Sequence, residues 1–535
     1  MAAMAPQARS RGNPWVILIV VSLGFFMTLL DLTIVNIAIP NMISRLHASL
    51  DDILWVINAY ALVLAVLLIT AGRLGDLLGQ RTVFFAGIAL FTVASAACGF
   101  APSPGWLIGF RAVQGLGAAL LMPQTLAILT MVFPAERRGA AFGVWGAVAG
   151  VATIAGPTLG GLLVTAFDWR YIFFINLPIG VVVLVLTPFL IPDLRTNRKH
   201  SFDIGGVLLA SLALLSICYA LVEGQKYNWG TITSFISIPL LFAVGVVLLV
   251  VFLWLQARRQ DGEPLVPFAL FKDRNYSLMN MVSAFIAIGM LGIFLPFSIY
   301  LQSVLGFSAL KAGLTMAPAS LVAMFVAPVA GRMSDRIGGK YILMAGLLLF
   351  AGGMGSIALI AQANSAWYDF LLPQVVAGIG IGCTFAPMTT VALRNVNPMM
   401  AGAASGVFNT SRQVGTVIGT AGVGALLQNR LIAGFTSQVQ VRAANLPLPA
   451  RDKLVAGFQS AAKGGLEVGS GARTTGLAGQ IFTHGFVDAM RPTILVPILF
   501  LIAGAASCIF IKRQPATVGS EVPAGVSEPT ATAAG

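Results

Sequence analysis

The stretch GRLGDLLGQR, Gly72 to Arg81, interrupts a long apolar run with two arginines and one aspartate. The pattern returns as GRMSDRIGGK, Gly331 to Lys340, at an offset of 331 − 72 = 259 residues. A short, charged and glycine-rich turn between two apolar segments of membrane length is not typical of a pair of soluble core helices. Its repetition predicts a tight cytoplasmic turn between two membrane spans, present once in each half of a duplicated membrane protein.

The composition of the chain agrees with this interpretation. The 535 residues are 57% hydrophobic and only 10% charged, whereas soluble domains carry about 25% charged residues. Several stretches exceed 18 apolar residues, which is the length that a membrane span requires. Within lipid only helices and closed barrels satisfy their backbone polar groups, and continuous rather than alternating apolar runs favour helices. We therefore expect an all-α polytopic membrane protein.

Apolar runs and their polar interruptions predict fourteen spans, in two six-helix halves with two accessory spans inserted between them. The repeat extends beyond the hinge, because Gly143-Val144 matches Gly406-Val407 at an offset of 263 residues. The expected spans are about 15–39, 53–71, 82–101, 106–132, 140–166, 171–191, 203–222, 232–255, 276–301, 312–330, 341–361, 368–393, 402–427 and 488–511. The corresponding regions are an N-terminal segment (1–14), the first half (15–191), a linker with the accessory spans (192–275), the second half (276–511) with a long loop (428–487), and a tail (512–535).

The distribution of basic residues predicts the orientation. With the N-terminus inside, the inward segments hold nineteen Lys and Arg, and the short outward loops hold four: Arg45, Arg170, Lys226 and Lys311. This asymmetry places both termini in the cytoplasm and the 428–487 segment outside, as a short hairpin or a surface helix. It also accounts for the net charge of +13 without a nucleic-acid partner.

No cofactor or metal is expected. The four cysteines all fall inside apolar runs, and the three histidines are scattered in polar loops, so neither set has the spacing of a disulfide framework or a metal site. No GxxxxGK[ST] phosphate-binding loop is present in the sequence, which argues against a built-in ATPase.

Asp31 is the residue that most clearly indicates a functional site. It lies in LLDLTIVNIAIP, with no other charge between Arg11 and Arg45, roughly 6 Å to the outer side of the middle of the first span. A carboxylate within a membrane is costly, and burial favours its protonated form, so Asp31 is a candidate proton carrier. The alternative is an aspartate that is already in the water of an outer vestibule.

Two arginines also fall inside spans. Arg111 opens RAVQGLGAALLMP and shares a helix face with Gln114, three residues on. It is expected either to be a fixed cation beside the proton site or to snorkel from the outer end of its span. Arg412, in the thirteenth span, is a similar but more isolated arginine, and it is expected either to pair with backbone carbonyls or to line a cavity.

Two further motifs suggest segments that change conformation. The hinge residues Gly72, Arg73, Asp76, Gly79, Arg81, Asp335 and Arg336 suggest a conformational latch, with the aspartates facing helix termini or arginines across the two halves. The fifth span, GAVAGVATIAGPTLGG, permits backbone-to-backbone helix packing and a bend; its motif residues are Gly156, Pro157, Gly160 and Gly161. Ordinary tight packing and a positive-inside turn are the simpler alternatives.

These motifs together resemble the major facilitator superfamily, and specifically its fourteen-span drug–proton antiporters. GRLGDLLGQR is similar to the superfamily's loop signature, RAVQGLGAAL to its span-four signature, and GPTLGG (156–161) to the antiporter signature of exporters. LDLTIVNIAIP and WRYIFFINLPIG (169–180) are similar to signatures of the fourteen-span branch. The chain departs from the family at Leu77, where a basic residue is common, and its thirteenth span lacks the acids that some members use for dicationic drugs.

The resemblance implies a proton-coupled antiporter that exports amphipathic or lipophilic compounds from a bacterial inner membrane, and not an enzyme. A dedicated exporter of a metabolite, lipid or siderophore is the alternative within transport, and a membrane sensor or scaffold is the alternative of another class. The expected partners are the bilayer, protons, small substrates and accessory envelope proteins. The expected proton-coupling residues are Asp31 and Arg111, and the expected substrate path comprises Thr33, Asn36, Asn58, Gln114, Asn409 and Arg412.

Overall fold

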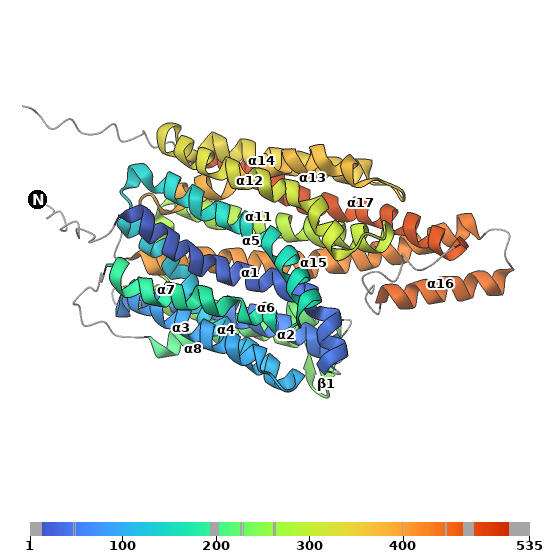
Figure 1. Ribbon diagram of the computed structural model, residues 1–535, viewed down its shortest axis with the longest axis horizontal. Coiled ribbons are helices and arrows are strands. Elements are labelled where there is room, and N and C mark those ends of the chain that lie inside the picture. The colour runs from blue at the N-terminus through green and yellow to red at the C-terminus, as the bar shows by residue number, and fades with distance from the viewer. Residues whose placement is uncertain are drawn as a thin grey trace, which may run out of the picture.

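A computed structural model describes residues 13–46, 48, 50–192, 203–224, 227, 229–260, 264–397, 400–443, 447–463 and 476–512. Long helices that run side by side along the long axis of the molecule dominate it (Figure 1). By length and composition, twelve helices in the described part of the chain are able to cross a membrane. The prediction of an all-α polytopic membrane protein is confirmed.

The first half contains six long helical units in the predicted order. Its helices are α1 (Pro14–Leu46), α2 (Leu50–Leu78), α3 (Gln80–Gly99), α4 (Pro104–Val132), α5 (Arg138–Ala166), and α6 (Tyr171–Phe174) continued by α7 (Asn176–Leu190), with the short 3-10 turn η1 (Ala135–Arg137) before α5. Many helices are longer than the apolar runs that predicted them, because the polar residues at their ends stay helical.

The second half repeats this order. Its helices are α11 (Arg274–Ile299), α12 (Ala309–Ile337), α13 (Gly339–Ile360), α14 (Leu371–Leu393), α15 (Ala401–Arg442) and α17 (Gly476–Ser507). Short turns extend three of them: the π-helix η2 (Tyr300–Val304), and the 3-10 turns η3 (Trp367–Phe370) and η6 (Cys508–Phe510).

α5 and α15 pack within the bundle, against α1 and α12 and against α2 and α11 respectively, although neither is among the twelve apolar helices. The predicted count of fourteen spans therefore stays a prediction.

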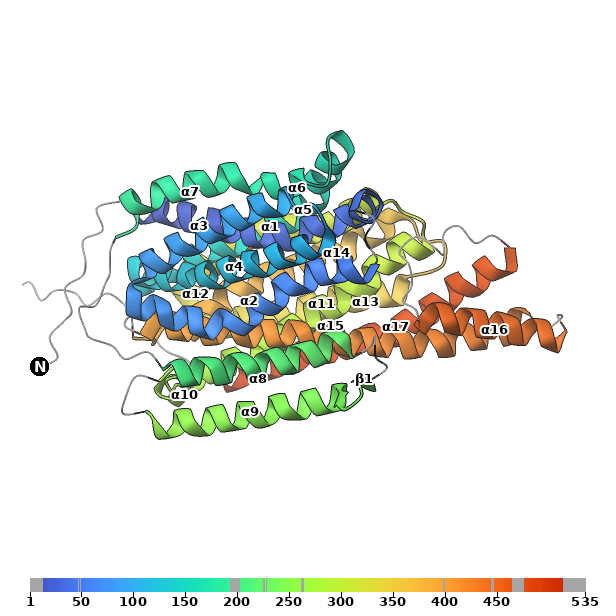
Figure 2. The same ribbon diagram turned by 90° about the horizontal axis from the view of Figure 1, so that it is seen from below.

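The two accessory helices lie at one side of the bundle (Figure 2). α8 (Ile204–Glu223) packs against α2 of the first half and α15 of the second, and α9 (Ile238–Arg258) packs against α8. A two-stranded antiparallel ribbon, β1 (Thr231–Thr233) with β2 (Ile236–Ser237), joins them, and the short α10 (Ala269–Lys272) leads into α11.

The predicted 428–487 loop is largely helical. α15 continues to Arg442, α16 (Leu448–Lys463) runs back beside it, and α17 begins at Gly476, so that the three form an extension beyond the bundle (Figure 1). Phe435 of α15 holds the extension together, with ring centroids 5.1 Å from Phe458 of α16 and 5.6 Å from Phe482 of α17. Of the two forms left open, the hairpin is the observed one.

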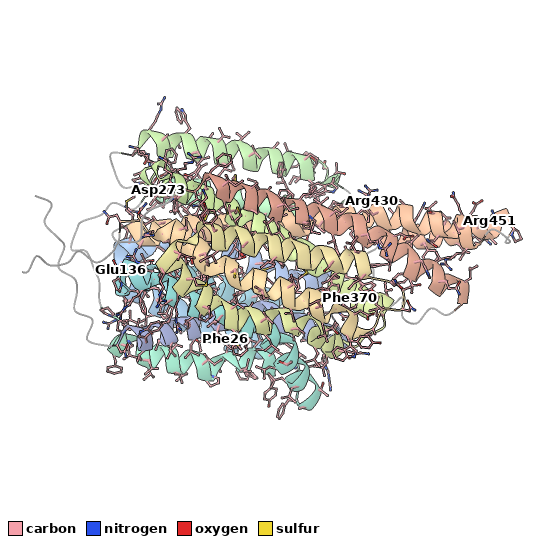
Figure 3. The ribbon with its side chains drawn as sticks, turned by 90° about the horizontal axis from the view of Figure 1, so that it is seen from above. Phe26, Glu136, Asp273, Phe370, Arg430 and Arg451 are labelled. Atoms are coloured by element: carbon pink, nitrogen blue, oxygen red, sulfur yellow. The ribbon has the colours of Figure 1, made fainter. Side chains whose placement is uncertain are left out.

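The extension stands at the opposite end of the molecule from the two hinges. Figure 3 shows Glu136 and Asp273 at one end of the bundle and Arg451 near the tip of the extension. The end of the described chain lies with Glu136 and Asp273, because the backbone N–H of Lys512 donates to Oδ1 of Asn275 at 3.0 Å. We call the Glu136 end the inner end, following the orientation that the basic residues predict.

Glycine makes both hinges possible. Gly79 stands between α2 and α3 with φ of 90°, and Gly338 between α12 and α13 with φ of 86°. These left-handed conformations are strained for other residues, and they allow two long helices to be joined by a single residue.

Candidate functional site

The buried centre of the first half is an ion pair between Asp31 of α1 and Arg111 of α4. The side chain of Asp31 is 0% exposed and that of Arg111 is 1% exposed, and Nη1 of Arg111 donates to Oδ2 of Asp31. Gln114 lies one turn further along α4 and completes the site: its Nε2 donates to Oδ1 of Asp31 at 3.0 Å, and its Oε1 accepts from Nη1 of Arg111 at 2.8 Å. Both carboxylate oxygens of Asp31 are therefore engaged.

The helix α2 closes the other side of the guanidinium. Nε of Arg111 donates to the carbonyl oxygen of Val56 at 3.0 Å, and its Cζ lies 4.3 Å from the ring centroid of Tyr60. The hydroxyl of Tyr60 donates to the carbonyl oxygen of Thr28 at 3.4 Å. A desolvated guanidinium over an aromatic face is stabilised by the ring quadrupole.

Burial removes two of the alternatives that the sequence left open. Arg111 does not snorkel, because its side chain is closed off by α1, α2 and Gln114. Asp31 does not stand in vestibule water, because its side chain is fully buried. Separating such a pair costs about 3–5 kcal/mol when one charge is left buried and uncompensated. Any change that removed the charge of Asp31 would therefore leave Arg111 without its counter-charge.

The described part of the second half shows no copy of this ion pair. Gly117 packs on the backbone of Phe91, and Gly380 packs in the same way on Phe350, which aligns α4 with α14. Counting six residues back from each glycine places Gln374 at the position of Arg111. Within the described residues the fully buried amide of Gln374 has no hydrogen-bond partner.

The two hinges meet the other half at the inner end. Asp76, at the end of α2, accepts hydrogen bonds from the backbone N–H groups of Gly402 at 2.8 Å and Ala403 at 2.7 Å, at the start of α15. Asp335, at the end of α12, accepts from those of Gly139 at 2.8 Å and Ala140 at 2.9 Å, at the start of α5. We call these four contacts the inner clamp.

The hydrogen bonds of the inner clamp come from helix N-termini, and the charges of Arg73 and Arg394 also act on Asp76 and Asp335 respectively. The first N–H groups of a helix have no partner within it and carry partial positive charge, so a carboxylate there is favoured. Nε2 of Gln80 also donates to Oδ1 of Asp76, at 3.1 Å. Asp76 is buried, whereas Asp335 is only partly buried, so the two contacts are not equally strong.

Glycines bring the two halves to backbone contact beside each aspartate. A Cβ added to Gly72 would overlap the carbonyl oxygen of Gly402, and one added to Gly331 would overlap that of Gly139. The inner end is therefore closed in this structure by two equivalent sets of contacts. Of the other hinge residues, Arg73 is buried and its charge acts on Asp76, whereas Arg336 is exposed and Arg81 is partly exposed.

The glycine motif of α5 lies against α1. A Cβ added to Gly156 would overlap Oγ1 of Thr33, and that hydroxyl donates to the carbonyl oxygen of Ala152 at 3.4 Å. The rings of Phe25 and Trp145 stack between the same helices with centroids 4.1 Å apart. A Cβ on Gly161 would meet open space, and Gly160 is buried.

Three of the predicted path residues lie elsewhere in the bundle, and two predicted side chains cannot be placed. Asn58 is partly buried on α2, and Asn409 of α15 accepts a hydrogen bond from Nη2 of Arg412 at 3.1 Å. The side chains of Asn36 and Pro157 lie outside the described residues.

Sequence reasoning missed Tyr60 and the start of α15. Tyr60 follows Val56 by one helical turn and shares its face, but nothing in the sequence shows which face of α2 meets Arg111. The partners of the two aspartates did have a signal: Gly139-Ala140-Ala141 and Gly402-Ala403-Ala404 recur at the offset of 263.

Comparisons with known proteins agree with this architecture. The family model described as "Major Facilitator Superfamily" matches residues 21–420. The solved structure of the proton:xylose symporter XylE aligns with a TM-score of 0.56 at 13% identity, over 84% of this chain and 94% of that chain, which is a likeness of fold alone.

Two bacterial relatives are similar over most of their length. The Tetracenomycin C resistance and export protein of Streptomyces glaucescens is 33% identical over 517 residues, which cover 96% of this chain and 94% of the relative. The Multidrug resistance protein Stp of Mycobacterium tuberculosis is 36% identical over 413 residues, which cover 77% of this chain and 75% of the relative. The chain therefore belongs to the major facilitator superfamily of membrane transporters, among relatives that confer antibiotic and multidrug resistance.

Proposed function

We propose that this protein exports small amphipathic or lipophilic compounds across the bacterial inner membrane in exchange for protons. The observation that carries the proposal is the buried Asp31 carboxylate, held by Arg111 and Gln114 inside the first half. An ionisable group in the middle of a membrane bundle is costly and generally serves transport. The relatives that export or resist antibiotics support the direction of transport.

The coupling follows from the charge balance of the ion pair. While Asp31 is ionised, it neutralises Arg111, and the pair is stable in its buried setting. When Asp31 takes a proton, Arg111 keeps its charge and loses its partner, so the bundle is driven toward a state in which another group or water solvates the guanidinium. Each charge that crosses is driven by about 2.3 kcal/mol per 100 mV.

Alternating access requires the inner clamp to open. With the inner end closed, Asp31 exchanges protons and the substrate is released on the outer side. With the two helix N-termini freed from Asp76 and Asp335, the cavity faces the cytoplasm, where the proton leaves and a new substrate enters. Both termini are cytoplasmic in this scheme.

Purified protein in proteoliposomes tests the proposal. An imposed pH gradient should drive accumulation of a lipophilic dye, and dye addition should in turn release protons, as read by a pH-sensitive fluorophore. Dye transport without proton movement would refute the coupling. Movement of neither would favour a sensor or scaffold instead.

A further inference from the structure

Arg412 is a cation in the second half that the mechanism above does not use. Its Nη2 donates a hydrogen bond to Oδ1 of Asn409, one turn back on α15, at 3.1 Å. A guanidinium has five N–H donors, so most of its capacity is left. Three ion pairs of the described chain join Asp31 with Arg111, Asp168 with Arg170, and Asp203 with Arg259, and Arg412 is in none of these three.

The face of α15 that carries Arg412 meets α4 on one side of that residue and α11 on the other: Gly419, seven residues after Arg412, packs on Ile288 of α11. Ser405 lies seven residues before Arg412, which is two helical turns and the same face. The hydroxyl of Ser405 donates to the carbonyl oxygen of Pro123 on α4 at 2.9 Å. Arg412 therefore stands between the contact with α4 and the contact with α11, about 10 Å further from the inner clamp than Ser405 at 1.5 Å per residue, and it is partly exposed.

The matching face of α4 is apolar and open. Leu120, Leu116 and Val113 lie three, seven and ten residues before Pro123, on one helix face; the two leucines are partly exposed and the valine is exposed. The residues between them, such as Gly117 and Ala118, are buried in the first half. At the level of Arg412, α4 thus presents apolar side chains that are not covered by the first half.

Arg412 also stands at nearly the depth of the proton site. Gln114 is nine residues from Pro123, which corresponds to about 13 Å, whereas Arg412 is about 10 Å from Ser405 at the same starting level. The ion pair of the first half is internally neutral. Of the two charged sites described at this depth, Arg412 is therefore the one that carries a net charge.

The repeat does not require these residues for packing. At the offset of 263 residues that aligns α5 with α15, Arg412 corresponds to Ala149 and Asn409 to Gly146. The same fold is built in the first half without a cation or an amide at these positions. A charge that is confined to one copy, within the membrane, points to a ligand rather than to the architecture.

We propose that Arg412, oriented by Asn409, binds the acidic group of the substrate, and that the exported compounds are amphipathic acids: carboxylates, phenols or enols with an apolar body. The apolar body packs against Leu116 and Leu120, and the anionic group accepts hydrogen bonds from the guanidinium. Amphipathic cations are disfavoured at this site by the charge of Arg412. This assignment rests on the proposed function, because it names the substrate class of the same cavity.

Inside-out membrane vesicles with an imposed proton gradient give the transport test, with fluorescein as the acidic probe and ethidium as the cationic one. The wild type should accumulate fluorescein in preference to ethidium. Arg412→Gln should raise the KM for fluorescein at least tenfold. Arg412→Lys keeps the positive charge but loses the planar guanidinium and its five N–H donors, and it should raise the KM less. Arg430→Gln is the matched control, since Arg430 is exposed on the same helix where it leaves the bundle (Figure 3), and it should leave the KM unchanged.

A binding measurement on purified protein in detergent tests the substrate class independently of proton coupling. Fluorescence polarisation of fluorescein should show at least tenfold weaker binding to Arg412→Gln than to Arg430→Gln, with both variants eluting as the wild type does in size exclusion. Equal binding by the two variants, or wild-type transport of ethidium but not of fluorescein, would overturn the assignment. Specific fluorescein binding without proton-driven transport of either probe would support the site and refute the proposed function.

Discussion

Asp76 of α2 accepts a hydrogen bond from the backbone N–H of Gly402 at 2.8 Å, although the two residues are 326 positions apart. The contact joins the end of a helix in the first half to the start of a helix in the second. Asp335 and Gly139 make the equivalent contact with the roles of the halves exchanged. A carboxylate at a helix N-terminus is stabilised by typically 0.3–1 kcal/mol, and by up to about 2 kcal/mol in partly buried geometry.

Asp76→Asn should weaken the closed inner end. Asparagine keeps one acceptor oxygen but loses the charge that favours the N-terminus of α15. A loss of about 1–2 kcal/mol would shift the balance of states five- to thirtyfold toward an open inner end. Spin labels at Leu78 and Ile337, both exposed at the ends of α2 and α12, should report a longer distance between the halves.

Asp335→Asn is the internal comparison for that variant. Because Asp335 is less buried than Asp76, solvent screens its contact, and the shift in distance should be smaller. Both variants should impair transport more than substrate binding. An unchanged distance distribution in Asp76→Asn, together with normal efflux, would show that the aspartate marks topology only.

Gly331→Ala should open the inner end because the added methyl group clashes with the neighbouring helix, and not because a charge is lost. A Cβ at this position would overlap the backbone of Gly139, so α12 and α5 must move apart. Transport should fall at least tenfold, and the Leu78–Ile337 label distance should increase. Gly352→Ala, where the added Cβ meets nothing within 4 Å, is the control and should transport as the wild type does. Equal activity of the two variants would contradict the close approach.

Asp31→Asn should abolish proton-driven efflux while the protein is still made and inserted. The amide keeps the shape of the side chain but cannot exchange a proton, and it leaves Arg111 without its counter-charge. Asp168→Asn removes the carboxylate of a partly exposed pair with Arg170 and should change transport little, because such pairs contribute about 0–1 kcal/mol. Accumulation driven by a pH gradient in Asp31→Asn vesicles would disprove the assignment of Asp31 as proton carrier.

The ring of Tyr60 should matter more than its hydroxyl. Tyr60→Phe keeps an aromatic face over Arg111 and loses only a long hydrogen bond to Thr28, so its efflux and thermal stability should be near wild type. Tyr60→Ala removes the ring and opens a cavity, which costs about 3–5 kcal/mol for a large aromatic side chain. Thermal unfolding of both variants in detergent measures the difference in stability. A larger loss of stability in Tyr60→Phe than in Tyr60→Ala would show that the hydroxyl matters more than the ring.

The orientation of the extension can be measured directly. Ala456→Cys places a thiol on an exposed position of α16, and an impermeant thiol reagent added to whole cells should label it. Glu136→Cys, at the inner end, should react only after permeabilisation. The wild type is the background control, since three of its four cysteines are buried and Cys383 is partly buried. The reverse pattern of labelling would invert the topology.

The sequence predicts the helices and the duplication well, for a simple reason. Within lipid the apolar runs must be helices, and glycines such as Gly79 and Gly338 mark the hinges between them. Apolar runs underestimate the helix lengths at the ends, most of all in α15, because a more polar stretch such as 428–442 stays helical when it packs on other helices. Hydropathy reports lipid contact and does not report that kind of packing.

The sequence singles out Asp31, Arg111 and Gln114, but it does not single out Tyr60 or the contacts that join these residues. A lone acid in a span signals its own importance, as Asp31 does, but its partner depends on the rotation of two helices that are 80 positions apart in sequence. The same holds for Asp76, whose partners are backbone groups at Gly402 and Ala403. Backbone N–H groups are present at every position, so no residue type identifies them.

The length of α15 has a mechanical consequence. Its 42 residues run without a break from the clamp contact at Gly402 to the extension at Arg442, a rod of roughly 63 Å at 1.5 Å per residue. The rings of Phe435, Phe458 and Phe482 fasten the outer part of that rod to its neighbours. One end of this rod is therefore in the bundle and the other is beyond it. If the extension is external, as the basic residues predict, an antibody fragment bound to its tip should shift the contacts at the inner end, and an inhibitor of this kind need not enter the cell.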